Sequence, residues 1–318
     1  ATLAWRIARF LLSEAPPDGG LFGAPPPPET LDSDPDHPAV RRACALSEPR
    51  LFLLRRGWDE KAKRLKTEIT VDETRKLHGF FGMSAADGGR RVVIVDAADE
   101  MNVSAANAIL KLLEEPPANA TLLLVCHRPA RLLPTIRSRC RELRCVPLKQ
   151  DDLTRALEQA GAVGELPDGL SELADGSAGA ALSLMGEDGA ALYQEIVDLI
   201  ATAPALDRPR ALKLADAAAG RGKEPRRDMT LRLVDLYLAR LALAGAGKPP
   251  LAEAARGESA ELARLSPDPI AARRWAALQQ DLSARAGHAL AVNLDPPSLI
   301  LDMVLSINET AAAILSRH

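Results

Sequence analysis

Several features are scarce in this sequence of 318 residues, and each scarcity excludes a class of protein. Aromatic residues make up 3%, which argues against the base-stacking surface of a single-strand nucleic-acid binder. The four cysteines include no C-x-x-C pair and follow no secretory signal, so a reduced, cytoplasmic setting is expected. The longest uncharged apolar runs, such as Leu122–Cys126, are far shorter than the roughly 20 residues of a membrane helix. The net charge of −3 indicates no positive field over the whole chain.

Hydrophobic residues are plentiful at 47%, and the first half of the chain arranges them as short strands that alternate with helices. Three apolar runs of strand length are Arg50–Arg56, Arg91–Asp96 and Thr121–Cys126, and Arg141–Val146 is predicted as the fourth and last strand. Strands that are apolar throughout and separated by helices indicate a parallel sheet covered on both faces. Residues 1–147 are therefore predicted to form an α/β domain.

Three helices are expected in this domain. The first, Ala1–Leu12, has no capping residue before it, and a chain that starts inside a helix predicts that residues precede it. Its apolar face at helical spacing consists of Leu3, Ile7, Phe10 and Leu11. The second begins with capping-box spacing between Thr70 and Glu73, and the third covers Val103–Glu115 before two prolines end it.

After Pro147 the strand patterns cease and the chain is predicted to be helical. Short amphipathic helices are expected at Asp151–Ala160, Leu166–Ala174, Ser177–Met185 and Leu192–Ala203. A longer Ala/Leu-rich stretch follows, with breaks at Gly220–Pro225, Gly245–Pro250, Ser266–Pro269 and Asp295–Pro297. Two further domains are therefore predicted, a small helical one over 148–205 and a larger helical one over 206–318.

Asp96 is the first residue that suggests chemistry. It ends an apolar strand, and an acid at the carboxyl edge of a parallel sheet lies where such folds bind nucleotide and metal. In ATPases of this type the next residue is usually a Glu that orients the attacking water, whereas Ala97 stands here. Asp96 fits a metal ligand and a cap of the following turn equally well.

Two motifs point to a family. A-A-N-A-I-L-K-L-L-E-E-P-P at 105–117 and R-P-A-R-L-L-P-T-I-R-S-R-C at 128–140 together resemble the bacterial clamp-loader AAA+ family. The resemblance implies a P-loop-type parallel sheet, with 148–205 as a degenerate lid and 206–318 as an oligomerisation collar. It also implies that the central strand of the sheet precedes Ala1, which predicts a gap between Thr121–Cys126 and Arg141–Val146.

By this resemblance Ser138, Arg139 and Cys140 form the motif that carries an arginine finger. The arginine acts in trans on ATP bound by a neighbouring subunit, and a permanently charged, forked guanidinium suits phosphate oxygens. The alternative interpretation is that Arg139 has no special function and is one of several solvated arginines at the end of a helix or strand.

The same resemblance implies that the chain's own nucleotide site is degenerate, with Asp96 at its acidic strand-end position. At four positions where the ATPase subunits of this family have side chains that bind or sense ATP, this sequence has alanine, glycine or a weakly polar pair. These positions are Ala1, Ala97, Cys126-His127 and Gly179. We therefore expect no ATPase or polymerase activity and no required cofactor, although binding of nucleotide without hydrolysis stays open.

The implied partners are the gamma/tau ATPase subunits, the delta subunit, the sliding clamp and primer–template DNA within a hetero-oligomer. Two alternatives remain: an active gamma/tau-like ATPase subunit, and a scaffold in which Arg139 is idle. Cys44 and His37 are too few for a structural zinc site, so no metal is expected. The basic clusters at 41–66 and 128–144 fit either a phosphate-tracking face or a solvated or intersubunit face.

Overall fold

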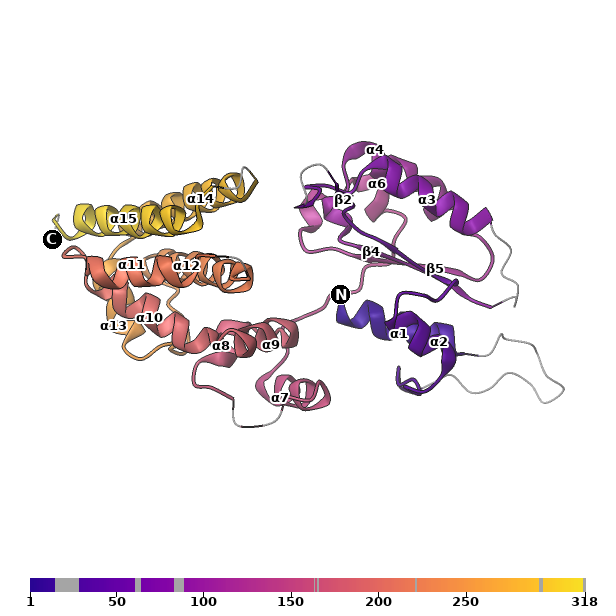
Figure 1. Cartoon of the computed structure of the whole chain (residues 1–318), viewed down its shortest axis with the longest axis horizontal. Coiled ribbons are helices and arrows are strands. Elements are labelled where there is room, and N and C mark those ends of the chain that lie inside the picture. The colour runs from indigo at the N-terminus through magenta and orange to yellow at the C-terminus, as the bar shows by residue number, and fades with distance from the viewer. Residues whose placement is uncertain are drawn as a thin grey trace. The chain divides into compact units, whose positions relative to one another are not determined.

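The computed structural model describes residues 1–14, 29–60, 64–82, 89–162, 164, 166–220, 222–291 and 294–316 (Figure 1). The chain divides into two compact units, Ala1–Arg144 and Cys145–His318. The first is α/β and the second is helical, which confirms the predicted fold class. Both predicted helical domains lie in the second unit, and their division near residue 205 stays a prediction.

The first unit is built on a three-stranded parallel sheet in the order β1-β4-β5. β1 is Leu51–Leu54, β4 is Arg91–Asp96 and β5 is Ala120–Val125, so three of the four predicted strands are confirmed. The central strand is the β-branched run R-V-V-I-V-D, in which the four apolar residues are 0% exposed. A strand covered on both faces needs such a run, because side chains on both sides enter a core.

Helices cover both faces of this sheet (Figure 1). Val92 and Ile94 pack against α1 (Thr2–Ser13) and α2 (Pro38–Cys44). The alternate residues of β4 pack against the opposite layer of helices. This layer comprises α3 (Val71–Gly82), α4 (Val103–Ala108), α5 (Leu110–Glu114) and α6 (Pro134–Arg137). The parallel sheet with its two helical layers therefore has two separate apolar cores.

Short elements complete the unit. A two-stranded hairpin pairs β2 (Trp58–Asp59) with β3 (Arg64–Leu65) in antiparallel register. Two 3₁₀ turns, η1 (Ala98–Glu100) and η2 (Pro129–Arg131), follow the carboxyl ends of β4 and β5. These turns therefore lie at the sheet edge where the sequence places Asp96.

Two predicted details of the helices differ from the structure. On the predicted apolar face of α1, Leu11 packs against the core beside the sheet, but Leu3 is 36% exposed and the buried side chains are Ala8 and Leu12. The capping box is not formed, since Thr70 Oγ1 is buried without a hydrogen bond and Glu73 pairs with lysines instead.

The helix predicted over 103–115 is interrupted at Ile109, which is fully buried between α4 and α5. Its start is fixed by Asn102, whose side chain accepts a hydrogen bond from the backbone N–H of Ala105 at 2.9 Å. The two motif-bearing helices are therefore short, and α5 ends at Glu114 directly before Glu115 and the two prolines.

The fourth predicted strand, Arg141–Val146, is wrong. Residues 141–149 have no regular secondary structure and their side chains are exposed. A strand needs a neighbour to bond its backbone, and among the described residues no strand lies beside this segment. β5 and this segment are not paired, so the outer edge of β5 has no partner strand in the described part of the chain.

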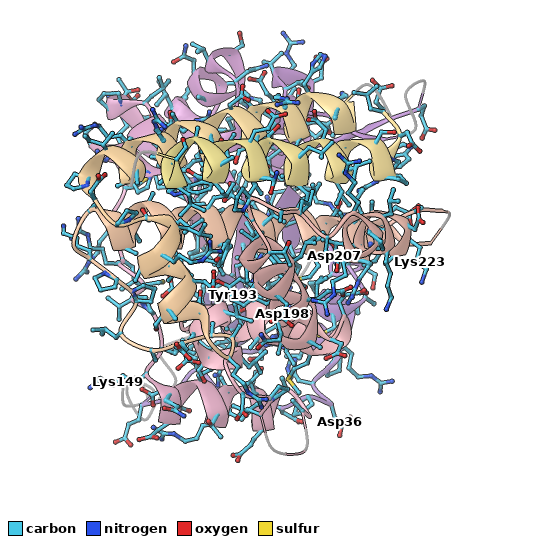
Figure 2. All side chains as sticks on the ribbon, turned by 90° about the vertical axis from the view of Figure 1, so that its left-hand side faces the viewer. Asp36, Lys149, Tyr193, Asp198, Asp207 and Lys223 are labelled. Carbon is cyan, nitrogen blue, oxygen red and sulfur yellow. The ribbon has the colours of Figure 1, made fainter. Side chains whose placement is uncertain are left out.

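The second unit consists of helices that enclose a single apolar core. They are α7 (Gln150–Gln159), α8 (Leu170–Ala174), α9 (Ala178–Gly186), α10 (Gly189–Ala201), α11 (Arg208–Ala217), α12 (Glu224–Gly245), α13 (Glu258–Leu265), α14 (Pro269–Ala291) and α15 (Pro296–Leu315). All four predicted breaks in the longer stretch separate two of these helices. Figure 2 shows Tyr193 within this unit, where it is fully buried, and Lys149 and Lys223 at its margin.

A polar network is buried in this helical core. Glu258 is 0% exposed and accepts hydrogen bonds from Tyr193 Oη at 2.5 Å and from the Ala254 backbone N–H at 2.7 Å. Arg240 Nη2 donates to Glu258 Oε2 at 3.0 Å, the same oxygen that accepts from Ala254. Burial, and then the adjacent carboxylate, raises the pKa of Tyr193 far above its ordinary value. The network ties α10, α12 and α13 together.

One helix of the described residues, α15, is long and apolar enough to cross a membrane, with a mean hydropathy of 1.5. Seven of its side chains are buried inside the helical unit: Leu299, Ile300, Met303, Val304, Ile307, Ala311 and Ile314. These residues form the face through which α15 packs into the apolar core of the helical unit.

Candidate functional site

The candidate finger Arg139 lies two residues after the end of α6. Pro134 begins this one-turn helix, and Ile136 anchors it because its side chain is 1% exposed in the core beside the sheet. The backbone N–H of Arg139 donates to Ile136 O at 3.0 Å, which continues the turn past the end of the helix. An apolar anchor three residues earlier thus fixes the backbone from which Arg139 projects.

The guanidinium of Arg139 is held by groups of its own chain. Nε donates to Glu114 Oε1 at 2.8 Å, and Nη2 lies 2.6 Å from the same oxygen. Nη1 donates to Thr135 O at 2.9 Å and to Ser138 Oγ at 3.3 Å. The structure therefore joins the two sequence motifs, because Glu114 belongs to E-E-P-P and Arg139 to S-R-C.

Both members of this pair face solvent. The side chain of Arg139 is 34% exposed and that of Glu114 is 48% exposed. A guanidinium keeps its charge at every pH at which a protein is folded, so Arg139 offers a permanent cation at the surface of the first unit. An exposed ion pair is also readily exchanged for another anion.

The other two residues of the motif support the arginine. Ser138 Oγ donates to Thr135 O at 3.1 Å and so helps to close the end of α6. Cys140 is half-buried against the apolar core, and burial raises the pKa of its thiol. A half-buried thiol with a raised pKa is a weaker nucleophile than an exposed thiol, which favours a packing role for Cys140.

The acid predicted at the sheet edge, Asp96, is half-buried at the last position of β4 opposite Val125. Among the described residues, no hydrogen bond or ion pair connects it with Arg139. Ala97 follows it with 4% exposure and offers no polar group. The structure thus does not bring the two predicted site residues into one centre.

A second carboxylate at this edge, to which the sequence analysis assigns no role, is Asp99. It accepts hydrogen bonds from the His127 backbone N–H at 3.0 Å and from Arg128 Nε at 3.1 Å, and its side chain is 1% exposed. Burial alone would raise the pKa of Asp99, but these two donors outweigh burial and lower the pKa. Asp99 therefore links the turn after β4 to the turn after β5, and its spacing of three residues from Asp96 was the available signal.

The predicted lid position Gly179 lies in the first turn of α9. Ser177 caps this helix by accepting a hydrogen bond from the Ala180 backbone N–H at 3.2 Å. A side chain at Gly179 would meet nothing within 4 Å, so packing leaves room for a larger residue there.

No group of three or more potential metal ligands occurs in the part of the chain that the structure describes. His37 Nδ1 accepts a hydrogen bond from the Ala39 backbone N–H at 3.3 Å and thereby caps α2. Cys44 lies exposed at the other end of that helix. His37 therefore has a structural role in the position where a zinc ligand was considered.

The basic cluster at 41–66 is partly neutralised by acids. Glu48 is 4% exposed between Arg42 Nε and Arg50 Nε, each 2.9 Å from a carboxylate oxygen. Burial opposes ionisation of Glu48, but the bonds to Arg50 and Arg42 together lower its pKa. Further pairs in this region join Arg56 to Glu100 and Lys66 to Glu73. Lys61 and Lys63 lie outside the described residues, as does the side chain of Arg64.

Trp58 is an exposed aromatic within this basic cluster that the sequence analysis overlooked. It is 53% exposed and stands opposite Leu65, which is 48% exposed, across the β2–β3 hairpin. The available signal was an aromatic residue among charged neighbours, since Trp58 lies in R-R-G-W-D-E-K.

The second basic cluster, 128–144, is more open. Glu142 is shared by Arg137 at 3.9 Å and Arg144 at 3.4 Å, both on the exposed surface. Arg131 and Arg141 are also exposed. Arg139 is the member whose guanidinium is held in a defined position by three different groups.

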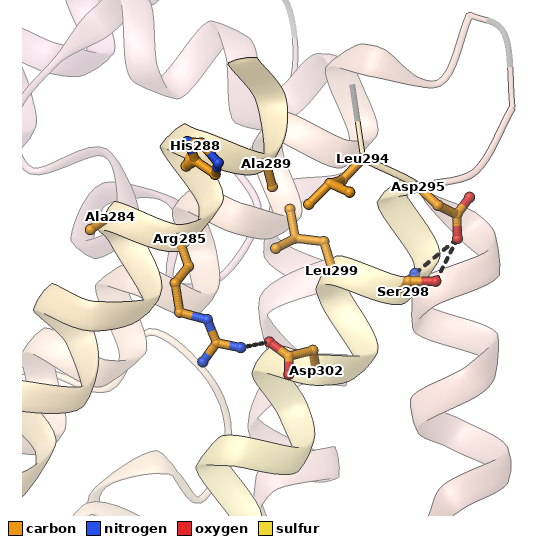
Figure 3. Close-up of a pocket in the computed structure, with 9 residues that line it drawn as sticks. All are labelled: Ala284, Arg285, His288, Ala289, Leu294, Asp295, Ser298, Leu299 and Asp302. Carbon is orange, nitrogen blue, oxygen red and sulfur yellow. Dashed lines mark hydrogen bonds and ion pairs between the residues drawn. The ribbon is translucent and has the colours of Figure 1, made fainter. Parts of the chain in front are cut away.

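A pocket of about 670 Å³ lies between α14 and α15 (Figure 3). Leu294 and Leu299 line it, and Arg285 pairs with Asp302 beside them. Asp295, also in its wall, caps α15 by accepting from the Ser298 backbone N–H at 3.2 Å. Its two carboxylates are thus engaged: Asp295 also accepts a hydrogen bond from Ser298 Oγ at 2.7 Å, and Asp302 pairs with Arg285.

Comparisons with known proteins agree with the motifs. Residues 37–149 match the family model described as DNA polymerase III, delta subunit. The chain is 45% identical over 136 residues to DNA polymerase III subunit delta' of Pseudomonas aeruginosa, which is 39% of each chain. It is 37% identical over 124 residues to subunit delta' of Escherichia coli, 39% of this chain and 37% of that one. It is 32% identical over 198 residues to subunit gamma/tau of Mycobacterium tuberculosis, 53% of this chain and 34% of that one. The matches thus span less than two fifths of the length of these relatives.

Proposed function

The chain belongs through residues 37–149 to the family of DNA polymerase III delta-prime subunits, and from this premise we propose that it is a clamp-loader subunit. Its contribution is Arg139, offered in trans to ATP on a neighbouring subunit. The subunit itself hydrolyses no nucleotide. The assembly uses ATP to open the sliding clamp and load it on primed DNA.

The observation that carries this proposal is the placement of Arg139. Its backbone is fixed by the buried Ile136, while its guanidinium is at the surface and 34% exposed. A finger must be rigid at its base and accessible at its tip, because it stabilises charge that develops on a phosphate held by another protein. In GTPases such an arginine accelerates hydrolysis on the order of 10³–10⁵-fold.

The residues around the chain's own nucleotide position support the absence of hydrolysis. Ala97 offers no carboxylate to orient water, and Gly179 offers no arginine to sense a phosphate. The buried carboxylate nearest to the strand ends, Asp99, is already engaged by His127 and Arg128. Each of these positions lacks a free group of the kind that ATP hydrolysis requires.

The proposed partners are the gamma/tau and delta subunits, the sliding clamp and primer–template DNA, all in the cytoplasm. In the 41–66 cluster Arg42 and Arg50 share the single carboxylate of Glu48, while Arg56 and Lys66 each pair with one acid, so the described cations are only partly neutralised. Contact of this cluster with DNA stays a prediction, as does its alternative, a solvated or intersubunit face.

The test is the ATPase of the assembled loader. Arg139→Ala should reduce kcat by at least ten-fold without changing assembly, and Arg139→Lys should restore only part of it because lysine lacks the fork. Arg141→Ala is the matched control, since Arg141 is an exposed arginine two residues further on. An unchanged kcat in the Arg139→Ala complex would refute the finger.

A second candidate function is that of an active gamma/tau-like ATPase subunit. The longer match to the gamma/tau subunit, over 198 residues, favours it. The discriminating measurement is ATP turnover by the purified chain alone. Turnover above background that survives Arg139→Ala would support this candidate, whereas background turnover supports the delta-prime role.

A further inference from the structure

The guanidinium of Arg139 has both of its binding edges occupied. One edge, Nε and Nη2, contacts Glu114 Oε1 at 2.8 and 2.6 Å. The remaining nitrogen, Nη1, donates to Thr135 O and Ser138 Oγ. Arginine binds a phosphate group most strongly through two parallel N–H groups on one edge of its guanidinium. In this arrangement Arg139 has to release one of its own partners before it can bind phosphate in that way.

Glu114 is the partner that can leave. Thr135 O belongs to the backbone of α6 and cannot move without breaking that helix. Glu114 ends α5, and its flexible side chain is 48% exposed. A triphosphate carries several negative charges and therefore competes well with a single solvated carboxylate.

We infer that Glu114 is a positioning residue that holds Arg139 in a resting position until the triphosphate of a neighbouring subunit replaces the Glu114 carboxylate. The inference rests on the proposed function, because it concerns the control of the same arginine. An exposed ion pair shifts an equilibrium by roughly five-fold at most. The Glu114–Arg139 ion pair is therefore weak enough to break when the neighbouring subunit places its bound nucleotide beside Arg139.

The first experiment compares Glu114→Gln with the wild-type chain in the assembled loader. Glutamine keeps the size of the side chain but removes the charge, so the fraction of free Arg139 rises. We expect kcat for ATP to increase about two- to five-fold. KM should stay unchanged, because the neighbouring subunit binds the nucleotide with its own residues.

Two further variants make this result specific. Glu115→Gln removes an identical charge at the next position, where the described residues show no ion pair, and should leave kcat unchanged. The double variant Glu114→Gln/Arg139→Ala should match Arg139→Ala alone, because Glu114 acts only through Arg139. If Arg139→Ala lowers kcat but Glu114→Gln does not raise it, this inference fails while the finger stands. If Arg139→Ala has no effect, both fail.

The second experiment observes the contact directly in the isolated chain. The Nε–Hε signal of Arg139 in ¹⁵N NMR, assigned by its loss in Arg139→Ala, should be protected from exchange with water. Glu114→Gln should move this signal and speed its exchange, and Glu115→Gln should not. A signal indifferent to Glu114→Gln would overturn the inference, whatever the kinetics show.

Discussion

Replacing Glu258 by glutamine tests whether the buried polar network stabilises the helical unit. The carboxylate is 0% exposed, and three different residues, Tyr193, Arg240 and Ala254, donate to it. Glutamine has the same shape, but it removes the negative charge that faces Arg240, which is 8% exposed. The amide N–H₂ group of the new glutamine is itself a donor. It must therefore lie opposite another donor, either the Tyr193 hydroxyl or the Ala254 N–H, where one of the present hydrogen bonds is lost.

The expected loss follows from the burial of both charges. Removing one member of a buried ion pair costs about 3–5 kcal/mol, because the other charge stays without a counter-ion. For a unit of this size, 1 kcal/mol corresponds to roughly 2–4 °C in Tm. Glu258→Gln should therefore lower the melting temperature of the helical unit by about 6–20 °C, measured by circular dichroism or calorimetry.

The control is Glu261→Gln on the same helix. Glu261 lies 2.7 Å from Arg264, but its side chain is 25% exposed, so its loss should cost about 1 kcal/mol or less. Tyr193→Phe should fall between the two, since it removes only one hydrogen bond to the carboxylate. A Glu258→Gln chain that melts within 2 °C of Glu261→Gln would refute the reasoning (roughly 1 kcal/mol at this size).

Two further predictions concern Asp99 and the four cysteines. Because the pKa of Asp99 is lowered in the folded chain, its stabilising contribution is complete above about pH 4 and is lost as the pH falls through that native pKa. In urea unfolding, the wild-type chain should have a higher free energy of unfolding than Asp99→Asn at pH 7, and this difference should shrink at lower pH. A difference that grows on acidification would contradict the prediction. Alkylation followed by mass spectrometry should label the exposed Cys44 and Cys145 first. Cys126 and Cys140 should be labelled later, because burial raises the pKa of their thiols. Early labelling of Cys140 would show that this residue is not packed as described.

The elements that could be predicted from sequence are those whose pattern is set by local burial. β4 is recognisable because a strand covered on both faces must be apolar at every position, and R-V-V-I-V-D has no other simple interpretation. Arg141–Val146, R-E-L-R-C-V, was predicted from three apolar residues among three charged ones but forms no strand, because strand formation depends on a neighbour that local sequence does not specify. The break of the E-E-P-P helix at Ile109 was equally invisible, since leucine and alanine surround it and favour a continuous helix.

The candidate site was predicted only in part, because some of its contacts join segments that are distant in sequence. Arg139 could be named from its motif, whereas its contact with Glu114 depends on how the ends of two short helices meet, 25 residues apart in sequence. Asp99 was passed over because its role arises only when the turn after β5 lies against it. Glu73 was assigned to a cap, but Lys66 and Lys76 attract it more strongly than the helix start does.

The exposed stretch from residue 141 to residue 149 has a practical consequence for handling the protein. It carries Arg141, Arg144 and Lys149, and from residue 141 to 147 no backbone–backbone hydrogen bond protects it within the described chain. Proteases cleave where several consecutive residues can be drawn into an extended conformation without unfolding a core. Brief digestion with trypsin should therefore cut here early and release two fragments, each of which keeps its own packed interior. Such fragments would allow the arginine-bearing half to be crystallised or titrated apart from the helical half.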